Sequence, residues 1–174
     1  MRHFLFLNTK GGVGKSTLCE YSYHELVRLG YAVNVDNTDQ QKHVTVVECE
    51  GAQFCLYDTA GAFTGANLEL LEAASSEDVD AKIIIPMSTG KNDNKEIEFL
   101  FDELKRLNLF DKSVVVFTKV RKNSKALAMR REELKVLGMP CLRWVMPQLE
   151  DFNLGLHSSK TRNEISAFLH EVAL

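Results

Sequence analysis

Short apolar runs alternate along the chain with longer segments in which apolar residues recur at helical spacing. The apolar runs predict β-strands, and their ranges are 2–7, 32–36, 53–58, 82–86, 113–118 and 141–146. The longer segments predict helices over 16–29, 66–74, 92–107, 123–137 and 161–173. Residues 44–48 are also expected to be extended, as an edge strand or as part of a hairpin.

This alternation predicts an α/β fold with one doubly wound, mostly parallel sheet and helices on both of its faces. The chain has 174 residues, the size of one domain, and its sequence contains no internal repeat, low-complexity stretch or linker. We therefore expect a single domain over 1–174. In open sheets of this kind ligands bind at the carboxyl ends of the strands, so polar residues there are the candidates for function.

Residues 10–17 read KGGVGKST and lie between the apolar run at 4–7 and the helix predicted from residue 16. A strand, a glycine-rich turn and a helix N-terminus direct backbone N–H groups and the positive end of a helix dipole toward one point. Glycines let the backbone of such a turn approach a ligand closely, and this loop has Gly11, Gly12 and Gly14. The arrangement predicts a binding site for the phosphates of a nucleotide.

The side chains after the glycines match the roles that a phosphate-binding loop requires. Lys15 occupies the position from which a lysine reaches the β- and γ-phosphates, and the Ser16 hydroxyl occupies the position that binds Mg²⁺. Thr17 is expected in the first helical turn, near the α-phosphate. The loop is a variant, because Thr9 stands where the ordinary pattern G-x-x-x-x-G-K-[ST] has its first glycine.

With its second lysine at position 10, KGGVGKST resembles the deviant Walker A motif of the ParA/MinD ATPases, which include plasmid and chromosome partition proteins. The resemblance spans essentially the whole chain. It implies a P-loop ATPase that binds ATP and Mg²⁺ through Lys10 to Thr17, Val13 included. It also implies an ATP-bound homodimer in which Lys10 reaches the nucleotide of the partner subunit and neutralises transition-state charge, as an arginine finger does. Lys10 and Lys15 are therefore candidate catalytic residues; the other interpretation of Lys10 is a solvated surface lysine.

The strand at 32–36 leads into residues 36–41, DNTDQQ, which are similar to the family's D-x-D-P-Q segment. The second aspartate is kept as Asp39, whereas Asn37 replaces the first aspartate and the proline is absent. Asp39 is the candidate catalytic carboxylate, because a carboxylate past a strand end and facing the γ-phosphate can position an attacking water. A different alignment of this segment with the family would give the catalytic role to Asp36. The remaining interpretation is that residues 36–41 form a polar turn without a catalytic role.

The strand at 53–58 ends in Asp58 and continues as a turn of small residues, TAG, at 59–61. It resembles a Walker B segment joined to a loop that senses the γ-phosphate. The resemblance implies that Asp58 holds Mg²⁺ through a water molecule and that the Gly61 N–H contacts the γ-phosphate. Loss of that phosphate would release the loop, which gives the protein a two-state switch.

Two later strand ends resemble segments that contact the base in this family. Thr118 ends the strand at 113–118, where relatives place an Asn or Thr against the adenine. Residues 145–148, VMPQ, are similar to the family's Ile-Pro-Arg turn over the base, so Pro147 and Gln148 are candidates for base contacts. Gln148 replaces the arginine, which favours contacts through backbone groups, and Pro147 alternatively only ends its strand.

Charge is distributed unevenly, although the net charge is only −3. Residues 48–103 contain thirteen acidic residues and three lysines, whereas residues 119–135 contain seven basic residues and two acidic ones. The second segment predicts a basic patch, and the residues assigned to it are Lys122, Lys125, Arg130 and Arg131. Such a patch binds the phosphate backbone of DNA without sequence preference, as the family's partition members do as ATP dimers. The alternative is a basic helix that only faces solvent.

The four cysteines show no C-x-x-C spacing, which favours reduced thiols in a reducing compartment. The N-terminus leads directly into a strand, without a signal peptide, and no apolar run reaches membrane-spanning length. We therefore expect a cytoplasmic protein without a membrane partner, associated with the nucleoid when it is bound to DNA.

Together these features predict an ATPase switch of plasmid or chromosome partition that works with a separate centromere-binding, ParB-like protein. A MinD-like membrane role is one alternative. It is disfavoured because the predicted C-terminal helix carries Glu164 and Glu171 on its polar side, so its apolar stripe is expected to pack on the domain. An accessory ATPase of conjugation or mobilisation, acting through a protein partner, is the second alternative. A metabolic synthetase similar to dethiobiotin synthetase is the third, and it leaves Lys10 unexplained.

Overall fold

The structure is a computed structural model, and it describes residues 1–38, 44–90 and 94–172. Its strands are, in chain order, β1 (Arg2–Phe6), β2 (Val33–Asn37), β3 (Phe54–Asp58), β4 (Ala81–Met87), β5 (Ser113–Val120) and β6 (Cys141–Pro147). Its helices are α1 (Lys15–Arg28), α2 (Gly65–Ala74), α3 (Asn94–Arg106), α4 (Lys125–Val136), α5 (Glu150–Asn153) and α6 (Ser159–Val172). Apart from the short α5, each of these elements was predicted within a few residues of its bounds.

The strands form one sheet in the order β2-β3-β1-β4-β5-β6, and every neighbouring pair is parallel. The chain reaches β2 from β1 by way of α1 and returns to β4 from β3 by way of α2, so β1 lies where the strand order reverses. A crevice at the carboxyl end of the sheet is expected at such a point. The predicted α/β fold class is confirmed.

The segment 44–48 is not a strand of this sheet. Val35 and Val47 exchange backbone hydrogen bonds of 2.8 and 2.9 Å as an isolated antiparallel bridge. Further along the segment, the Cys49 N–H donates to the side-chain oxygen of Asn34 at 2.7 Å instead of to a backbone carbonyl. A side chain thus takes the place of the next backbone acceptor, which explains why the predicted edge strand is reduced to one bridge.

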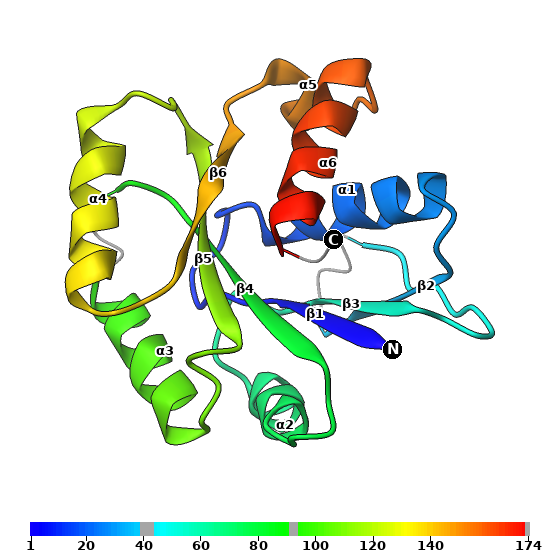
Figure 1. The fold of residues 1–174 in the computed structure, drawn as a ribbon, viewed down its shortest axis with the longest axis horizontal. Coiled ribbons are helices and arrows are strands. Elements are labelled where there is room, and N and C mark those ends of the chain that lie inside the picture. Colours follow the sequence, from blue (N-terminus) through cyan, green and yellow to red (C-terminus); the bar gives the residue numbers. More distant parts are fainter. Residues whose placement is uncertain (39–43, 91–93, 173–174) are drawn as a thin grey trace.

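Helices cover both faces of the sheet (Figure 1). Alternate strand residues point to opposite faces, so Phe4 and Phe6 belong to one core, and Leu5 and Leu7 belong to the other. Helices α1 and α6 contribute to the first core, whereas α2, α3 and α4 contribute to the second. The doubly wound arrangement follows directly from the nearly continuous apolar strands that the sequence shows.

Helix α1 is terminated by Gly30, a residue type that is typical of helix C-termini. Gly30 has φ of 92°, a conformation that costs glycine little. Its N–H donates to the Val27 carbonyl at 3.0 Å, and the Tyr31 N–H donates to the Leu26 carbonyl at 3.1 Å. These two bonds satisfy the last carbonyls of α1 and turn the chain back toward β2.

Helix α6 packs on the domain, as its apolar stripe predicted. Ile165, Phe168 and Leu169 are fully buried in the core that α1 shares. On the polar side, the Glu171 carboxylate accepts hydrogen bonds from the backbone N–H of Trp144 and its neighbour, and Glu164 accepts one from the Trp144 indole at 2.9 Å. These acidic side chains therefore anchor α6 to β6. Among the described helices, none combines the length and the apolar character needed to span a bilayer.

Candidate functional site

A cleft of about 890 Å³, here called the main cleft, opens at the carboxyl end of β1. Its walls are formed by the loop from Gly11 to Thr17, by the connection that follows β3 (residues 60–66), and by Glu20, Thr38 and Lys119. The position is the one expected from the reversal of strand order, and the volume suits a nucleotide.

The loop before α1 has the conformation of a phosphate cradle. Gly12 and Gly14 have φ of 74° and 89°, values that a side chain would make costly. Gly14 is the N-cap of α1 and provides no side-chain cap for the first N–H groups of the helix. An anion placed in the main cleft would satisfy those groups and would lie at the positive end of the helix dipole.

The ammonium group of Lys15 provides a positive charge at this site. Its side chain is only 6% exposed, and its Nζ donates to the Lys10 carbonyl at 3.3 Å. A methyl group built on Gly61 would lie 3.6 Å from the Lys15 Nζ and 3.3 Å from the Gly11 Cα. Gly61 therefore lies directly against the loop, where any larger residue would displace backbone. The predicted neighbours Lys15 and Gly61 are thus together in the structure.

Two buried side chains fix the loop from behind. Asn8 donates from Nδ2 to the Pro86 carbonyl at 2.6 Å and accepts the Lys10 N–H at 2.8 Å. Thr118 donates from Oγ1 to the Val13 carbonyl at 2.6 Å and is fully buried. Thr118 was predicted to face the adenine, but its hydroxyl supports the loop and is absent from the walls of the main cleft. Asn8 carries no motif signal in the sequence.

Lys119, which follows Thr118, extends toward the phosphate loop. It has φ of 56° and lies at an irregularity in the register between β5 and β6. Such an irregularity re-aims a side chain. The Lys119 Nζ donates to the Gly12 carbonyl at 2.9 Å, and Lys119 lines the main cleft. Its position at a strand end was the only sequence signal for this role.

The predicted magnesium ligands offer the oxygen donors that Mg²⁺ prefers. Ser16 lines the main cleft. Asp58 is completely buried at the end of β3, and its carbonyl accepts the Thr38 N–H at 3.0 Å. Burial, and then the nearby Asp58 carboxylate, raise the pKa of the Cys19 thiol well above its usual value. Asp58 therefore lies close to Cys19 of α1.

Asn67 ties the end of β2 to the connection after β3. Its Nδ2 donates to the Ala62 carbonyl at 2.8 Å, and its backbone N–H donates to the Thr64 hydroxyl at 3.3 Å. Its Oδ1 accepts the Thr38 hydroxyl at 3.3 Å. Because Asn67 is 1% exposed, these contacts are shielded from water. An asparagine in a helix first turn gave no sequence signal for this function.

The candidate catalytic residue Asp39 lies outside the described residues. The alternative, Asp36, is exposed on β2, and its Oδ1 accepts the N–H of Asn37 at 2.7 Å. Asp36 is absent from the walls of the main cleft. The geometry around Asp36 thus gives no support to the shifted register.

A smaller pocket of about 220 Å³, here called the side pocket, adjoins the main cleft and shares Thr17 and Lys119 with it. Pro147 and Gln148, at and after the end of β6, form another part of its wall. The structure therefore places both predicted base-contacting residues beside the phosphate loop. Their contact with a base stays a prediction.

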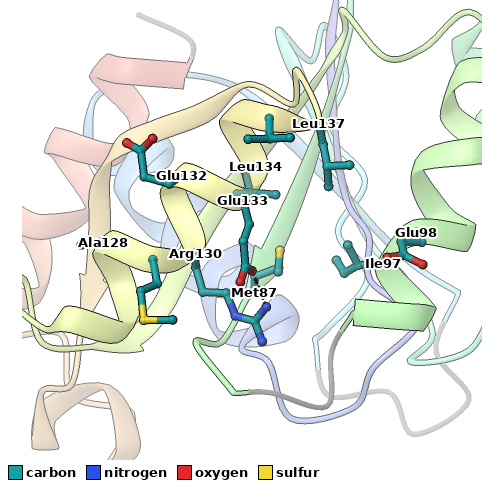
Figure 2. Close-up of a pocket in the computed structure, with 11 residues that line it drawn as sticks. Met87, Ile97, Glu98, Ala128, Arg130, Glu132, Glu133, Leu134 and Leu137 are labelled. Atoms are coloured by element: carbon teal, nitrogen blue, oxygen red, sulfur yellow. Dashed lines mark hydrogen bonds and ion pairs between the residues drawn. The ribbon is translucent and has the colours of Figure 1, made fainter.

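The predicted basic patch is only partly on the surface. Arg130 is 7% exposed, pairs with Glu133, and donates to the Gly90 carbonyl, so its inclusion in a solvent-facing patch is wrong. Figure 2 shows Arg130 and Glu133 together on α4. The neighbouring Arg131 donates to the carbonyls of Leu142 and Arg143. The guanidinium groups of both arginines therefore bind backbone carbonyls within the protein. The sequence pattern gave no sign of these carbonyls, because they belong to segments distant in the chain.

One side of α4 borders an apolar groove where DNA contacts were expected. A groove of about 740 Å³ between α3 and α4, the α3–α4 groove, is lined mainly by aliphatic side chains (Figure 2). Met129 and Val136 in it are 65% and 86% exposed. Such a surface does not suit a phosphate backbone. Lys122, paired with Glu164 at 3.3 Å, and Lys125 stay exposed at the other end of the helix.

Comparison with known proteins matches residues 4–160 to the CobQ/CobB/MinD/ParA nucleotide binding domain. Similar structures include cobyrinic acid a,c-diamide synthase from Mycobacterium smegmatis with bound ADP and magnesium (13% identity, 98% of this chain and 94% of that chain, TM-score 0.72). A protein from Borrelia burgdorferi B31 described as a plasmid partition protein, bound to AMPPNP, is 16% identical (97% and 98%, TM-score 0.69). The MinD cell division protein of Aquifex aeolicus is 14% identical (100% and 99%, TM-score 0.69). The search of curated proteins gave no match.

Proposed function

The chain belongs to the CobQ/CobB/MinD/ParA nucleotide-binding family, and from this premise we propose that it is an ATP-dependent ATPase switch that dimerises with ATP. The observation that carries the proposal is the phosphate cradle. Gly12 and Gly14 have the positive φ angles of a tight glycine-rich turn, and the buried Lys15 begins the helix that follows it without a side-chain cap. ADP with magnesium in one similar structure and AMPPNP in another support the same ligand class here.

The proposal gives each candidate residue one role. Lys15 binds the β- and γ-phosphates, and Ser16 and Asp58 hold Mg²⁺, which supplies charge neutralisation at the phosphates. Thr17 contacts the α-phosphate, and the side pocket with Pro147 and Gln148 receives the base. Lys10 is half-buried at the start of the loop and acts on the nucleotide of the partner subunit.

The switch is the connection after β3. The Gly61 N–H binds the γ-phosphate, and Gly61 lies against Gly11 with no room for a side chain. Asn67 joins the same connection to Thr38 by the bonds described above. Loss of the γ-phosphate contact therefore changes the conformation of both the connection and the end of β2. A partner subunit that contacts these two surfaces would bind differently in the two states.

Asp39→Ala is expected to keep ATP binding and ATP-dependent dimerisation but to lose most hydrolysis, by about 10²-fold or more, because a carboxylate that positions water is lost while phosphate contacts stay. Phosphate release and size-exclusion chromatography with ATP and Mg²⁺ measure the two effects. Asp36→Ala is the matched control and should hydrolyse normally. The reverse pattern would move the catalytic role to Asp36.

For the biological role, we propose partition of plasmid or chromosomal DNA together with a centromere-binding, ParB-like protein. Lys122 and Lys125 support DNA contact, because the β5–α4 connection lies at the carboxyl edge of the sheet and both lysines are exposed. A dimer formed at this edge would join two such basic clusters. Binding to phosphate backbones would then depend on ATP and on ionic strength.

The test is a gel shift of arbitrary duplex DNA beside size-exclusion chromatography, with and without ATP and Mg²⁺. The wild-type chain should dimerise and bind DNA only with ATP, and affinity should fall steeply with salt. Lys122→Glu with Lys125→Glu should abolish the shift and leave the ATP dimer intact. Lys135→Glu is the control, since Lys135 is exposed in the same helix about 15 Å further along its axis. Equal DNA binding by the double variant would refute this patch.

A protein partner alone is the second candidate function, as in an accessory ATPase of conjugation or mobilisation. The specific observation in its favour is the α3–α4 groove, with Met129 and Val136 exposed and Arg130 withdrawn into packing. Exposed apolar side chains gathered in one groove are a feature of protein-contact surfaces. An ATP-bound dimer that does not bind DNA even at low salt would favour this function over partition.

A further inference from the structure

Three potential metal ligands meet on the side of α1 that faces away from the sheet. One ligand atom each from Glu20, His24 and His157 lies within 4.8 Å of the other two. Glu20 and His24 are four residues apart, so they occupy one face of α1, and His157 reaches them from the connection between α5 and α6. We propose that these residues form a binding site for a divalent transition-metal ion of the Zn²⁺ class.

The position of His157 is built into the fold. The Tyr21 hydroxyl donates to the carbonyls of Leu156 and Asp151 at 3.1 and 3.2 Å, which ties the connection to α1 one residue after Glu20. The Thr161 hydroxyl also donates to the Leu156 carbonyl, at 3.0 Å. The backbone directly before His157 is therefore held by α1 and by α6, as a preorganised site requires.

Ring contacts bring the imidazoles together. The His157 ring lies 4.4 Å from the His24 ring and 4.6 Å from the Tyr21 ring, measured between centroids. Ligand atoms around a tetrahedral Zn²⁺ are about 3.3 Å apart, given bonds of about 2.0 Å. Both histidines are exposed, so rotation of their side chains closes the remaining distance, and water takes the fourth position.

The donor set decides the class of metal. Two imidazoles and one carboxylate suit Zn²⁺ and its neighbours Co²⁺ and Ni²⁺, whereas Mg²⁺ and Ca²⁺ prefer oxygen ligands throughout. This site is therefore distinct in chemistry from the magnesium position at Ser16 and Asp58. It does not rest on the proposed function, because its evidence is the geometry of Glu20, His24 and His157, although Glu20 also lines the main cleft.

A bound ion would join two walls of the nucleotide-binding region. Helix α1 begins at the phosphate loop and Glu20 lines the main cleft, while the segment after β6, which leads to His157, forms the side pocket. The ion would add a cross-link between positions 24 and 157, which are adjacent in space and far apart in the chain. Because the unfolded chain does not present this arrangement, binding stabilises the fold.

Isothermal titration calorimetry with Zn²⁺ alone tests the site, on tag-free protein in a Cys49→Ser background, because Cys49 is an exposed free thiol that binds the same ion. We expect one Zn²⁺ per chain. His24→Ala and His157→Ala should each weaken binding at least about tenfold, and Glu20→Gln should weaken it less. His170→Ala is the matched control, since His170 is an exposed histidine of α6 outside the cluster.

Two further readouts separate a built site from adventitious binding. Co²⁺ should give the visible absorption of tetrahedral coordination in the background protein and in His170→Ala, but not in His24→Ala or His157→Ala. Zn²⁺ at about 100 times its Kd should raise Tm by about 5–10 °C in the same two proteins only. Far-UV circular dichroism of each variant confirms that it is folded. Unchanged Zn²⁺ affinity in folded His24→Ala and His157→Ala would overturn the site.

Discussion

Lys15→Ala is expected to weaken ATP binding by at least about 100-fold, equivalent to about 3 kcal/mol. The reason is burial: the Lys15 side chain is 6% exposed, and its Nζ lies between the Lys10 carbonyl and Gly61. A triphosphate bound there is shielded from water, so the loss of its buried cation is not compensated by solvent. Binding of a fluorescent ATP analogue with Mg²⁺ measures the effect.

Lys160→Ala serves as the control for Lys15→Ala, because Lys160 is exposed in the first turn of α6, outside the main cleft. It should bind ATP like the wild-type chain. Lys119→Ala should have an intermediate effect, since Lys119 lines the main cleft but is exposed and donates to the Gly12 carbonyl. If Lys15→Ala bound ATP with wild-type affinity, the assignment of the phosphate site to this loop would be wrong.

Lys10→Ala is expected to bind ATP normally and to lose both the ATP-dependent dimer and hydrolysis, the latter by about 10³-fold. Lys10 is absent from the walls of the main cleft, and its backbone N–H and carbonyl contact Asn8 and Lys15. Alanine keeps both of these backbone groups, so the loop conformation is expected to persist within its own subunit. Size-exclusion chromatography with light scattering gives the mass of the ATP-bound species, and phosphate release gives the rate.

Lys10→Arg is the informative companion of Lys10→Ala. It keeps the positive charge at the proposed dimer interface and should retain the ATP-bound dimer, although the geometry of the guanidinium differs. Normal dimerisation of Lys10→Ala would assign Lys10 to the solvated surface. Loss of ATP binding in the same variant would instead show that the side chain serves its own subunit.

Local sequence was sufficient for the elements and for the phosphate loop. The strand and helix patterns depend on residues within one segment, and a glycine-rich turn before a helix determines its own conformation, as the φ angles of Gly12 and Gly14 show. Ser16 and Lys15 follow directly because the start of α1 sets their direction. The segment 44–48 failed as a strand, since a side chain of β2 supplied the hydrogen bond that a neighbouring strand would have supplied.

Tertiary structure decided which strand-end side chains face the main cleft. An irregular register between β5 and β6 turns Lys119 toward the loop and leaves Thr118 behind it, although the two residues are adjacent in sequence. Asn67 reaches Thr38 across 29 positions, and Arg130 reaches Gly90 across 40. A pattern within one short segment cannot predict contacts between residues so far apart in the sequence.

The sequence by itself therefore determined the α/β class, the order of the elements and the conformation of the glycine-rich loop, because periodicity and glycine conformations act within a few residues. Packing of distant segments decided the rest: the burial of Arg130, the support of the loop by Asn8 and Thr118, and the meeting of His24 with His157. These contacts depend on how far each strand is shifted against its neighbour and on which helix face meets the sheet. Both quantities are set only when the whole core is assembled.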